Sequence, residues 1–526
     1  MIQEPTMKKK GGFTKGFKMF LVALVVGIVA IVAVQFKLIP TSGSSGSSAS
    51  SGGFLGIGGG SNSDGIVVSV VTWGGYAGGE YFNGGFESSD QSRYVTELNT
   101  KVSFKLDDQV ATGRQSFLNG NRNVLWATVD ALPTEINHLK VNGKYPKVFF
   151  QSDWSRGGDA IVAKTSIHSV KDLKGKKVSC AFNTPSHSML LKMLDANDMT
   201  VQDLNIIKVD DATASAQAYQ SGNVDAAVVW SPDDETCVKK VPDTHVLISS
   251  KEASHIISDV FIASDEYIQS HHKELVALVK GWLKGAAELN SNPEAKQKAA
   301  AILSKSFTGI SPEDAMGAIQ NARLTTFGDN KQFFNQNSSG VHAREIYENM
   351  ARLYTKSGYL KEDVPDWSQI YDGSILADVD LSTDGPNAPE GTEDFSSRPV
   401  IAKVTEEKVF TDKRLTIEFA TGSSMLTEDN KQMLRSQFLP IASSFSNMPI
   451  QVVGNTDNTG NPATNLALSK SRAQAVADFM RKEGGFDSHR FYVKGAGSSA
   501  PISDNTTPDG RARNRRTDLQ LIKEAN

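Results

Sequence analysis

The sequence predicts two α/β-type domains in series behind one membrane-spanning helix. Three observations lead to this prediction: an apolar run near the N-terminus, a long region in which strand and helix patterns alternate, and a shorter such region after a break rich in Pro, Gly and Ser. A chain of 526 residues is also too long for one ordinary hydrophobic core. We therefore expect at least two separately packed domains.

Composition narrows the function classes. The net charge is −4 with both signs mixed along the chain, whereas a nucleic-acid protein shows a basic stripe, so no nucleic-acid partner is expected. Cys180 and Cys237 are the only cysteines, and two buried thiols or one incidental bridge are both open. No Cys/His cluster has metal-ligand spacing, so neither a metal nor a cofactor is predicted.

The run Met19–Phe36, MFLVALVVGIVAIVAVQF, is long enough to cross a bilayer. Five lysines precede it, and the positive-inside rule then predicts a cytoplasmic basic tail (1–18), a single inner-membrane anchor (19–38) and all later residues in the periplasm. A cleaved signal peptide is the alternative. The span contains no Asp, Glu, Lys or Arg, which argues against a stator-like ion channel.

Two segments with the composition of linkers divide the chain after the predicted anchor. Residues 39–65 are mostly Gly and Ser and predict a flexible tether with a reach of about 25–30 Å. The stretch DVDLSTDGPNAPEGTEDFSSR marks a second linker, placed at 378–405. The expected domains are therefore 66–377 and 406–526.

In the large domain, strands alternate with helices, which predicts an α/β fold with mainly parallel sheets. Strands are expected at Ile66–Trp73, Lys176–Phe182 and Val224–Trp230. Thr184 with Pro185, and Ser231 with Pro232, each supply a capping residue and a proline in the first helical turn. Ligands of such folds sit at the carboxyl ends of strands, near helix N-termini.

Three stretches, QSDWSRGGDAIVAK, SVKDLKGKKVSCAFNTPSHSMLL and QAYQSGNVDAAVVWSP, resemble periplasmic solute-binding proteins of the nitrate, taurine and alkyl-sulfonate type. The likeness extends over about Ile66–Leu376. It implies two α/β lobes that close on a small solute, with an ABC importer as a candidate partner. It also implies a solute-binding cleft lined by Trp73, Tyr76, Ser152, Asp153, Thr184, Ser186, His187, Trp230 and Asp233.

Each of these residues also has a structural interpretation. Trp73 and Trp230 can fill the core at strand ends, and Ser186 and His187 can support a helix. The sequence departs from the family in its Gly-rich start, WGGYAGGEYFNGGF, and in the acids Asp153 and Asp233. A sulfonate or nitrate would require Arg or Lys, so a cationic or neutral solute stays open.

The small domain shows its own alternation. Strands are expected at Arg414–Phe419, Pro449–Gly454, FYVKGAG and TDLQLI. Thr427 is expected to cap a helix that runs to about Phe445, and Pro462 to open the next helix. The predicted order is β-α-β-α-β-β, an α+β two-layer sandwich.

One acid and one arginine in this domain are placed to meet. Asp457 follows a strand, and the helix that starts near Ala463 brings Asn465, Ser469 and Arg472 to one face. An acid beside a guanidinium suits a zwitterion, because the acid holds an ammonium and the arginine a carboxylate. The alternative is that Asp457 and Arg472 only form a surface pair, in which a partly exposed arginine adds little stability.

The motifs FATGSSMLTEDNKQML, VVGNTDNTGNPATNLALSKSRAQAVADFM, VKGAGSSAPISDN and RARNRRTDLQL resemble the OmpA C-terminal, peptidoglycan-binding domain over about Phe410–Ile522. The likeness implies that the acid and the arginine hold the diaminopimelate of the wall stem peptide. The implied peptidoglycan-binding residues are Asp457, Arg472, Asn465, Thr456 and Ser469. Asn455 stands where that family often has a histidine.

These observations predict a membrane-anchored envelope protein that joins a solute-binding module to a peptidoglycan-binding module. A purely structural tether, whose large domain binds no solute, is the rival hypothesis. An enzyme is not expected, because no set of nucleophile, base and acid stands out in the sequence.

Overall fold

The computed structural model describes residues 65–335, 340–391, 395–396, 409–415, 417, 419–420 and 422–522. The predicted tail, the anchor and the tether up to residue 64 lie outside the described residues, as does most of the predicted linker after residue 391. Within the described part of the chain, no helix is both long and apolar enough to cross a membrane.

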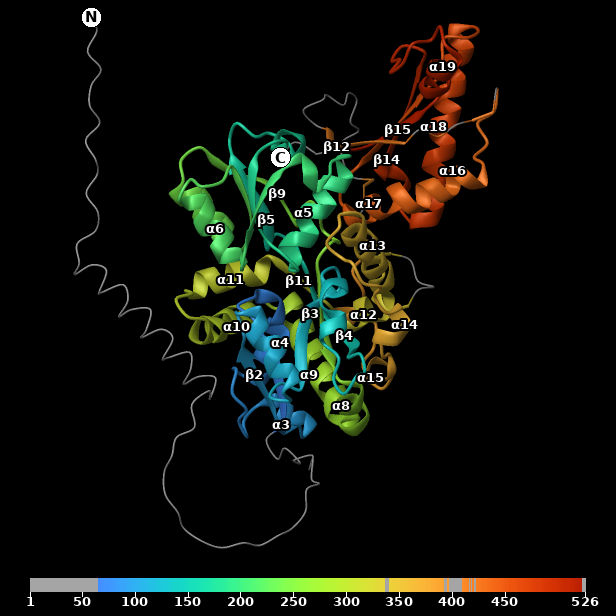
Figure 1. The fold of residues 1–526 in the computed structure, drawn as a ribbon. Coiled ribbons are helices and arrows are strands. Elements are labelled where there is room, and N and C mark those ends of the chain that lie inside the picture. The colour runs from blue at the N-terminus through green and yellow to red at the C-terminus, as the bar shows by residue number, and fades with distance from the viewer. Residues whose placement is uncertain are drawn as a thin grey trace, which may run out of the picture. The chain divides into compact units, whose positions relative to one another are not determined.

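The first lobe of the large domain is built on a six-stranded mixed sheet of order β11-β4-β10-β3-β1-β2 (Figure 1). Its strands are β1 (Ile66–Val70), β2 (Val102–Leu106), β3 (Val124–Thr128), β4 (Lys147–Ser155), β10 (Ser258–Ala263) and β11 (Ala322–Leu324). The helices in this part of the sequence are α2 (Ala77–Asn83), α3 (Arg93–Leu98), α4 (Val110–Leu118), α8 (Asp265–Ser270), α9 (His272–Ser291), α10 (Pro293–Ser306), α11 (Pro312–Gln320), α12 (Phe327–Phe333), α13 (Ala343–Lys356), α14 (Trp367–Ile370) and α15 (Ser374–Ala377). Trp282 of α9 fills the core against Phe104, Phe150 and Phe261.

The second lobe is a five-stranded mixed sheet of order β7-β6-β8-β5-β9. Its strands are β5 (Asp159–Lys164), β6 (Lys177–Ala181), β7 (Asn205–Val209), β8 (Ala226–Trp230) and β9 (Thr244–Ser249), and its helices are α5 (Pro185–Ala196), α6 (Ala212–Gln220) and α7 (Asp233–Lys240). The expectation of mainly parallel sheets is wrong. β5 and β10, the strands by which the chain enters a lobe, each run antiparallel to both neighbours.

The chain passes between the lobes twice, from β4 to β5 and from β9 to β10. Hydrogen bonds tie the two crossings together. Ser155 Oγ lies 2.8 Å from Ser250 Oγ and donates to Asp159 at 2.7 Å, and the Gly157 N–H donates to Ser250 Oγ at 2.7 Å. Asp159 therefore belongs to the hinge between the lobes as well as to β5.

Most of the predicted local structure of the large domain is present, with one clear exception. Thr184 occupies the N-cap position of α5, with Pro185 in the first turn, although its hydroxyl donates to the Ala181 carbonyl. Ser231 does not cap the next helix. α7 begins at Asp233, and Ser231 Oγ instead accepts a hydrogen bond from Asn321 Nδ2 at 3.0 Å.

The beginning of the predicted linker is folded against the large domain. Gly385–Asn387 form a 3₁₀ turn. Thr326 Oγ1 donates to the Ala388 carbonyl at 2.8 Å, and the Glu390 N–H donates to Asp329 at 2.6 Å. These contacts place residues 385–390 with the large domain rather than in a free linker.

The small domain has a four-stranded sheet of order β12-β15-β13-β14. Its strands are β12 (Val409–Leu415), β13 (Ile450–Asn455), β14 (Phe491–Gly497) and β15 (Thr517–Ile522), and its helices are α16 (Glu428–Met433), α17 (Leu439–Ser444), α18 (Pro462–Gly484) and α19 (Pro508–Asn514). β13 and β14 are parallel, whereas β15 is antiparallel to β12 and β13. Val452, Val476 and Leu519 lie in its core.

Two predictions for the small domain are wrong. The first strand spans Val409–Leu415 rather than 414–419, because Leu415 already pairs with Thr517, the first residue of β15. The order β-α-β-α-β-β omits α19, where Thr507 accepts from the Gly510 N–H and Pro508 occupies the first turn. The caps predicted at Thr427 and the helix start at Pro462 are confirmed.

Candidate functional site

A cavity of about 30 Å³ lies between the two lobes of the large domain. It is lined by Val71, Thr72, Trp73, Tyr76, Trp126, Thr128, Asp159, Pro185, Trp230, Ile257 and Asp259. Three of the nine predicted solute-binding residues are in this lining: Trp73, Tyr76 and Trp230. Aromatic side chains from both lobes therefore meet at one place.

Trp73 is held in position by the hinge. Its indole Nε1 donates to Asp153 Oδ1 at 3.0 Å, and its ring packs against Gly158, where an added Cβ would overlap it. The Gly158 position has no room for a side chain, so the first lobe and the β4–β5 crossing meet closely at this tryptophan.

Asp153 and Ser152 lie beneath the cavity rather than in its wall. Ser152 Oγ donates to Asp153 Oδ2 at 2.7 Å, and both residues are fully buried. Burial raises the pKa of Asp153 to about 6, although hydrogen bonds from Ser152 and Trp73 oppose the shift. These two predicted residues therefore do not line the cavity, but Asp153 accepts a hydrogen bond from Trp73, which does.

Two further acids, Asp159 and Asp259, face the cavity. Asp159 is 4% exposed, and its Oδ1 has no hydrogen-bond partner within the described residues. Burial raises its pKa to about 7. Asp259 accepts from the Tyr76 hydroxyl at 3.3 Å, and its pKa is raised well above the ordinary value, first by burial and next by the charge of Asp153.

The other four predicted solute-binding residues do not line this cavity. Thr184 and Ser186 are buried at the start of α5. His187 stacks on Phe182 with ring centroids 4.3 Å apart, and burial lowers its pKa to about 3, so it is a neutral core histidine. Asp233 accepts from Thr213 on the surface of the second lobe.

Sequence reasoning missed Trp126, Asp159 and Asp259. The available signal was the position of acids within apolar, strand-like sequence, since Asp259 interrupts IISDVFIA and Asp159 opens DAIVAK. A charged side chain in a buried strand needs a partner or a function.

In the small domain, Asp457 is paired with an arginine that the prediction did not include. Its Oδ2 accepts from Arg515 Nη1 at 2.8 Å, and its Oδ1 accepts from the Thr459 N–H at 2.9 Å. Burial acts to raise the pKa of Asp457, but these hydrogen bonds hold it below the ordinary value. Arg515 lies in the RARNRR run, and that basic run was the signal for it.

Arg472 is buried beside this ion pair instead of forming it. It is 2% exposed. Its Nε donates to the Ser423 carbonyl at 2.9 Å and its Nη2 to the Ala420 carbonyl at 3.2 Å. The guanidinium also lies over the Phe419 ring, 5.0 Å from its centroid. The alternative of a simple Asp457–Arg472 surface pair is therefore wrong.

The three remaining predicted residues shape the loop that carries Asp457. Asn465 Nδ2 donates to the Thr459 carbonyl at 3.0 Å, and Ser469 Oγ accepts from the Gly497 N–H at 3.0 Å. Thr456 is 4% exposed and its N–H donates to the Gly497 carbonyl. The bonds of Asn465 and Thr456 hold the loop against α18 and β14, and the bond of Ser469 joins α18 to β14.

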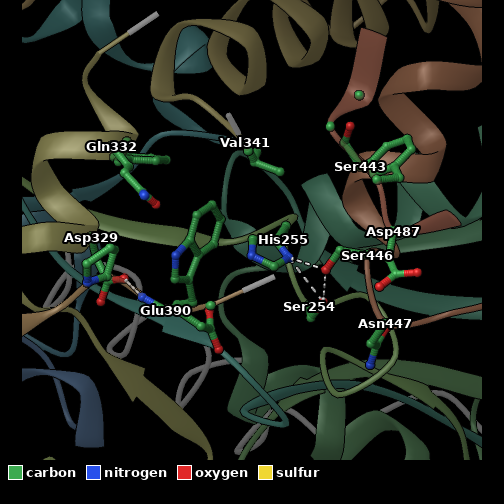
Figure 2. A pocket seen from close by; sticks show the side chains of 18 of the residues that line it. Ser254, His255, Asp329, Gln332, Val341, Glu390, Ser443, Ser446, Asn447 and Asp487 are labelled. Carbon is green, nitrogen blue, oxygen red and sulfur yellow. Dashed lines mark hydrogen bonds between the residues drawn. The ribbon is translucent and has the colours of Figure 1, made fainter. Parts of the chain in front are cut away.

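A second cavity, of about 320 Å³, contains none of the fourteen predicted solute-binding or peptidoglycan-binding residues (Figure 2). Its lining includes Ser254, His255, Asp329, Gln332, Glu390, Ser446 and Asn447. Glu390, in its wall, is ion-paired with Arg156 at 2.9 Å. Among the described residues, no group of His, Cys, Asp and Glu has the geometry of a metal site, and both cysteines are free and buried.

Comparison with known proteins identifies both domains. Residues 418–515 match the OmpA family. Residues 158–296 match the family described as NMT1/THI5 like. The resemblance of each domain that the motifs predicted is thereby confirmed.

Curated relatives cover only part of this chain. Outer membrane protein A of Bordetella avium is 36% identical over 104 residues, which are 20% of this chain and 53% of that protein. The peptidoglycan-binding protein ArfA of Mycobacterium tuberculosis is 44% identical over 70 residues, 13% of this chain and 21% of ArfA. The chain thus spans about half, or less, of the length of these relatives.

Solved structures resemble the large domain in fold. The periplasmic aliphatic sulphonate binding protein SsuA from Escherichia coli is 16% identical, with 58% of this chain and 97% of SsuA covered and a TM-score of 0.46. The desulfurization enzyme DszB is 12% identical, with 60% and 98% covered and a TM-score of 0.42. At these identities the likeness concerns the fold alone.

Proposed function

We propose that this protein is an envelope protein that attaches to peptidoglycan through residues 406–526 and binds a small solute between the lobes of residues 66–377. The run Met19–Phe36 would anchor it in the inner membrane, with its N-terminus in the cytoplasm and the bulk of the chain in the periplasm. An ABC importer is the candidate recipient of the solute.

One observation carries the peptidoglycan part. Asp457, on a loop held by Asn465 and Thr456, is ion-paired with Arg515 beside the buried Arg472. Diaminopimelate is a zwitterion at its free end. Its ammonium would take the place of the Arg515 guanidinium on Asp457, and its carboxylate would bind the released arginine in bidentate fashion. The OmpA-family match supports this assignment.

A peptidoglycan pull-down with the full chain tests the assignment. Asp457→Asn keeps the size of the side chain but removes its charge, and should weaken binding by about 30-fold or more. Asp478→Asn, on α18 and 54% exposed, is the matched control and should bind normally. Equal binding of Asp457→Asn and wild type would contradict the proposal.

A variant of Arg515 distinguishes two possible roles of this arginine in peptidoglycan binding. If diaminopimelate binds Arg515 through its carboxylate, Arg515→Ala should weaken binding as Asp457→Asn does. If Arg515 only neutralises Asp457 in the free protein, its removal should leave binding unchanged or improve it. Arg435→Ala, in the exposed pair with Glu483, is the control for loss of an arginine.

The solute part rests on the two-lobed fold and the cavity at its hinge. Thermal unfolding with a library of metabolites tests it, because any ligand that binds the native state raises the unfolding temperature. If no metabolite has an effect, the rival of a purely structural tether is favoured. We propose binding rather than catalysis, in keeping with the curated relatives named above.

A further inference from the structure

The interlobe cavity combines aromatic rings with carboxylates. The residues concerned are Trp73, Tyr76, Trp126 and Trp230 as rings, with Asp159 and Asp259 as acids. This lining contains no lysine or arginine. A volume of about 30 Å³ is room for about two water-sized groups, so the cavity as it stands suits a small head group.

Neither carboxylate forms an ion pair with a cationic side chain among the described residues. Asp159 uses Oδ2 to accept from Ser155, while its buried Oδ1 has no partner within the described residues. Asp259 faces another acid, Asp153, across the strand pair. Buried carboxylates without a cationic partner are costly, and the raised pKa values of Asp159 and Asp259 reflect that cost.

Arg114, which lies next to Trp126 of the cavity lining, already forms an ion pair. Arg114 lies over the Trp126 ring, 4.2 Å from its centroid, and donates two hydrogen bonds to Glu135, at 2.8 and 2.9 Å. Arg114 is therefore ion-paired with Glu135, and it is not one of the residues that line the cavity. An aromatic ring attracts a cation over its face more strongly than a neutral group.

We propose that this cavity binds the ammonium head group of an organic cation, with Asp159 and Asp259 as counter-ions and aromatic rings as walls. This inference rests on the proposed solute-binding function and names the class of solute. An anionic head group would instead meet two carboxylates and no base in the lining, and would repel them in a dry site.

Titration of the full chain at pH 8 and constant ionic strength tests the proposal. The cationic probes are methylammonium, tetramethylammonium and choline, followed by tryptophan fluorescence and calorimetry. The neutral control is 3,3-dimethyl-1-butanol, which has the shape of choline without its charge, and the anionic control is isethionate. At least one cation should bind at least about tenfold more tightly than both controls.

Variants then locate the binding site. Asp159→Asn should weaken binding of the cation by about tenfold or more, whereas Asp90→Asn, an exposed aspartate of the same domain, should leave it unchanged. Trp230→Leu should weaken binding and Trp230→Phe should retain most of it, because phenylalanine keeps a ring face.

Four outcomes would overturn the proposal. Binding of isethionate in preference to every cation would overturn the cation assignment and leave solute binding standing. Failure of all three cations to bind more tightly than the neutral analogue, or unchanged affinity in Asp159→Asn, would do the same. No binding by any of the five probes at millimolar concentration would overturn the cation assignment, and a flat metabolite screen beside it would also overturn the solute-binding function.

Discussion

Asp153 on β4 and Asp259 on β10 stand opposite each other in an antiparallel strand pair, and both are buried. Two carboxylates this close in a dry site do not ionise together at low cost. Burial and then the charge of Asp153 hold the pKa of Asp259 well above its ordinary range, while the pKa of Asp153 is raised to about 6. Ionisation of Asp153 therefore opposes ionisation of Asp259.

The acids of the cavity make stability depend on pH in a specific direction. The pKa of Asp159 is raised to about 7, so between about pH 4 and 7 the folded state binds a proton that the unfolded state has lost. Its contribution to stability is therefore lost as pH rises through that window. The charged groups that act on Asp159 include Asp130, Asp153 and Asp234, and as acids they raise its pKa further.

The difference in free energy of unfolding between Asp159→Asn and wild type should therefore shift in favour of the variant as the pH rises from 5 to 8. The expected shift is about 1–4 kcal/mol. Urea unfolding of both proteins without solute, at several pH values, measures the difference. Asp90→Asn should follow wild type at every pH. A difference that shrinks or stays constant with rising pH would contradict the buried, unpaired state of Asp159.

Trp73→Phe removes the N–H that donates to Asp153. That hydrogen bond stabilises the charged carboxylate, so its contribution is present above about pH 6 and is lost as pH falls through that value. We expect a loss of about 1–2 kcal/mol at pH 8 and a smaller loss at pH 5. The control is Trp367→Phe, because Trp367 stacks on Tyr371. This variant should lose the same free energy of unfolding at both pH values.

Arg472→Ala should lose stability as well as peptidoglycan binding. Arg472 is 2% exposed and donates to two backbone carbonyls, those of Ala420 and Ser423, so its loss should cost about 2–3 kcal/mol. This corrects the expectation that a partly exposed arginine would add little. Arg472→Lys keeps the positive charge but lacks the planar guanidinium group, and it should also bind peptidoglycan less well. Arg481→Lys, 51% exposed on the same helix, should change neither property.

The topology of the chain gives a fourth prediction. A periplasmic reporter fused after Asn526 should be active, and the mature protein should retain Lys8, Lys9 and Lys10. Deletion of residues 1–40 behind an independent export signal should release the protein from the membrane fraction. Removal of the N-terminal lysines during export would contradict the anchor and favour a cleaved signal peptide.

Short-range features were predictable from the sequence. Thr427 caps its helix and Pro462 opens α18 as expected, because capping and the fixed φ of proline act within one helical turn. The motifs also identified both domains, since each preserves residue types at fixed spacing along one loop and one helix. Trp73, Tyr76 and Trp230 were implied by the resemblance of the large domain to solute-binding proteins.

Only the tertiary structure decided which charges meet. Asp457 pairs with Arg515, 58 residues away, and Asp153 on β4 faces Asp259 on β10, the strand that returns to the first lobe after the second has been built. Such partners depend on strand order and register, which follow from the packing of the whole domain rather than from neighbours in the chain. Most of the elements and both domain types followed from the sequence alone. The fold decided that three buried acids, Asp153, Asp159 and Asp259, would gather near the hinge, because burial and pairing are properties of the assembled lobes.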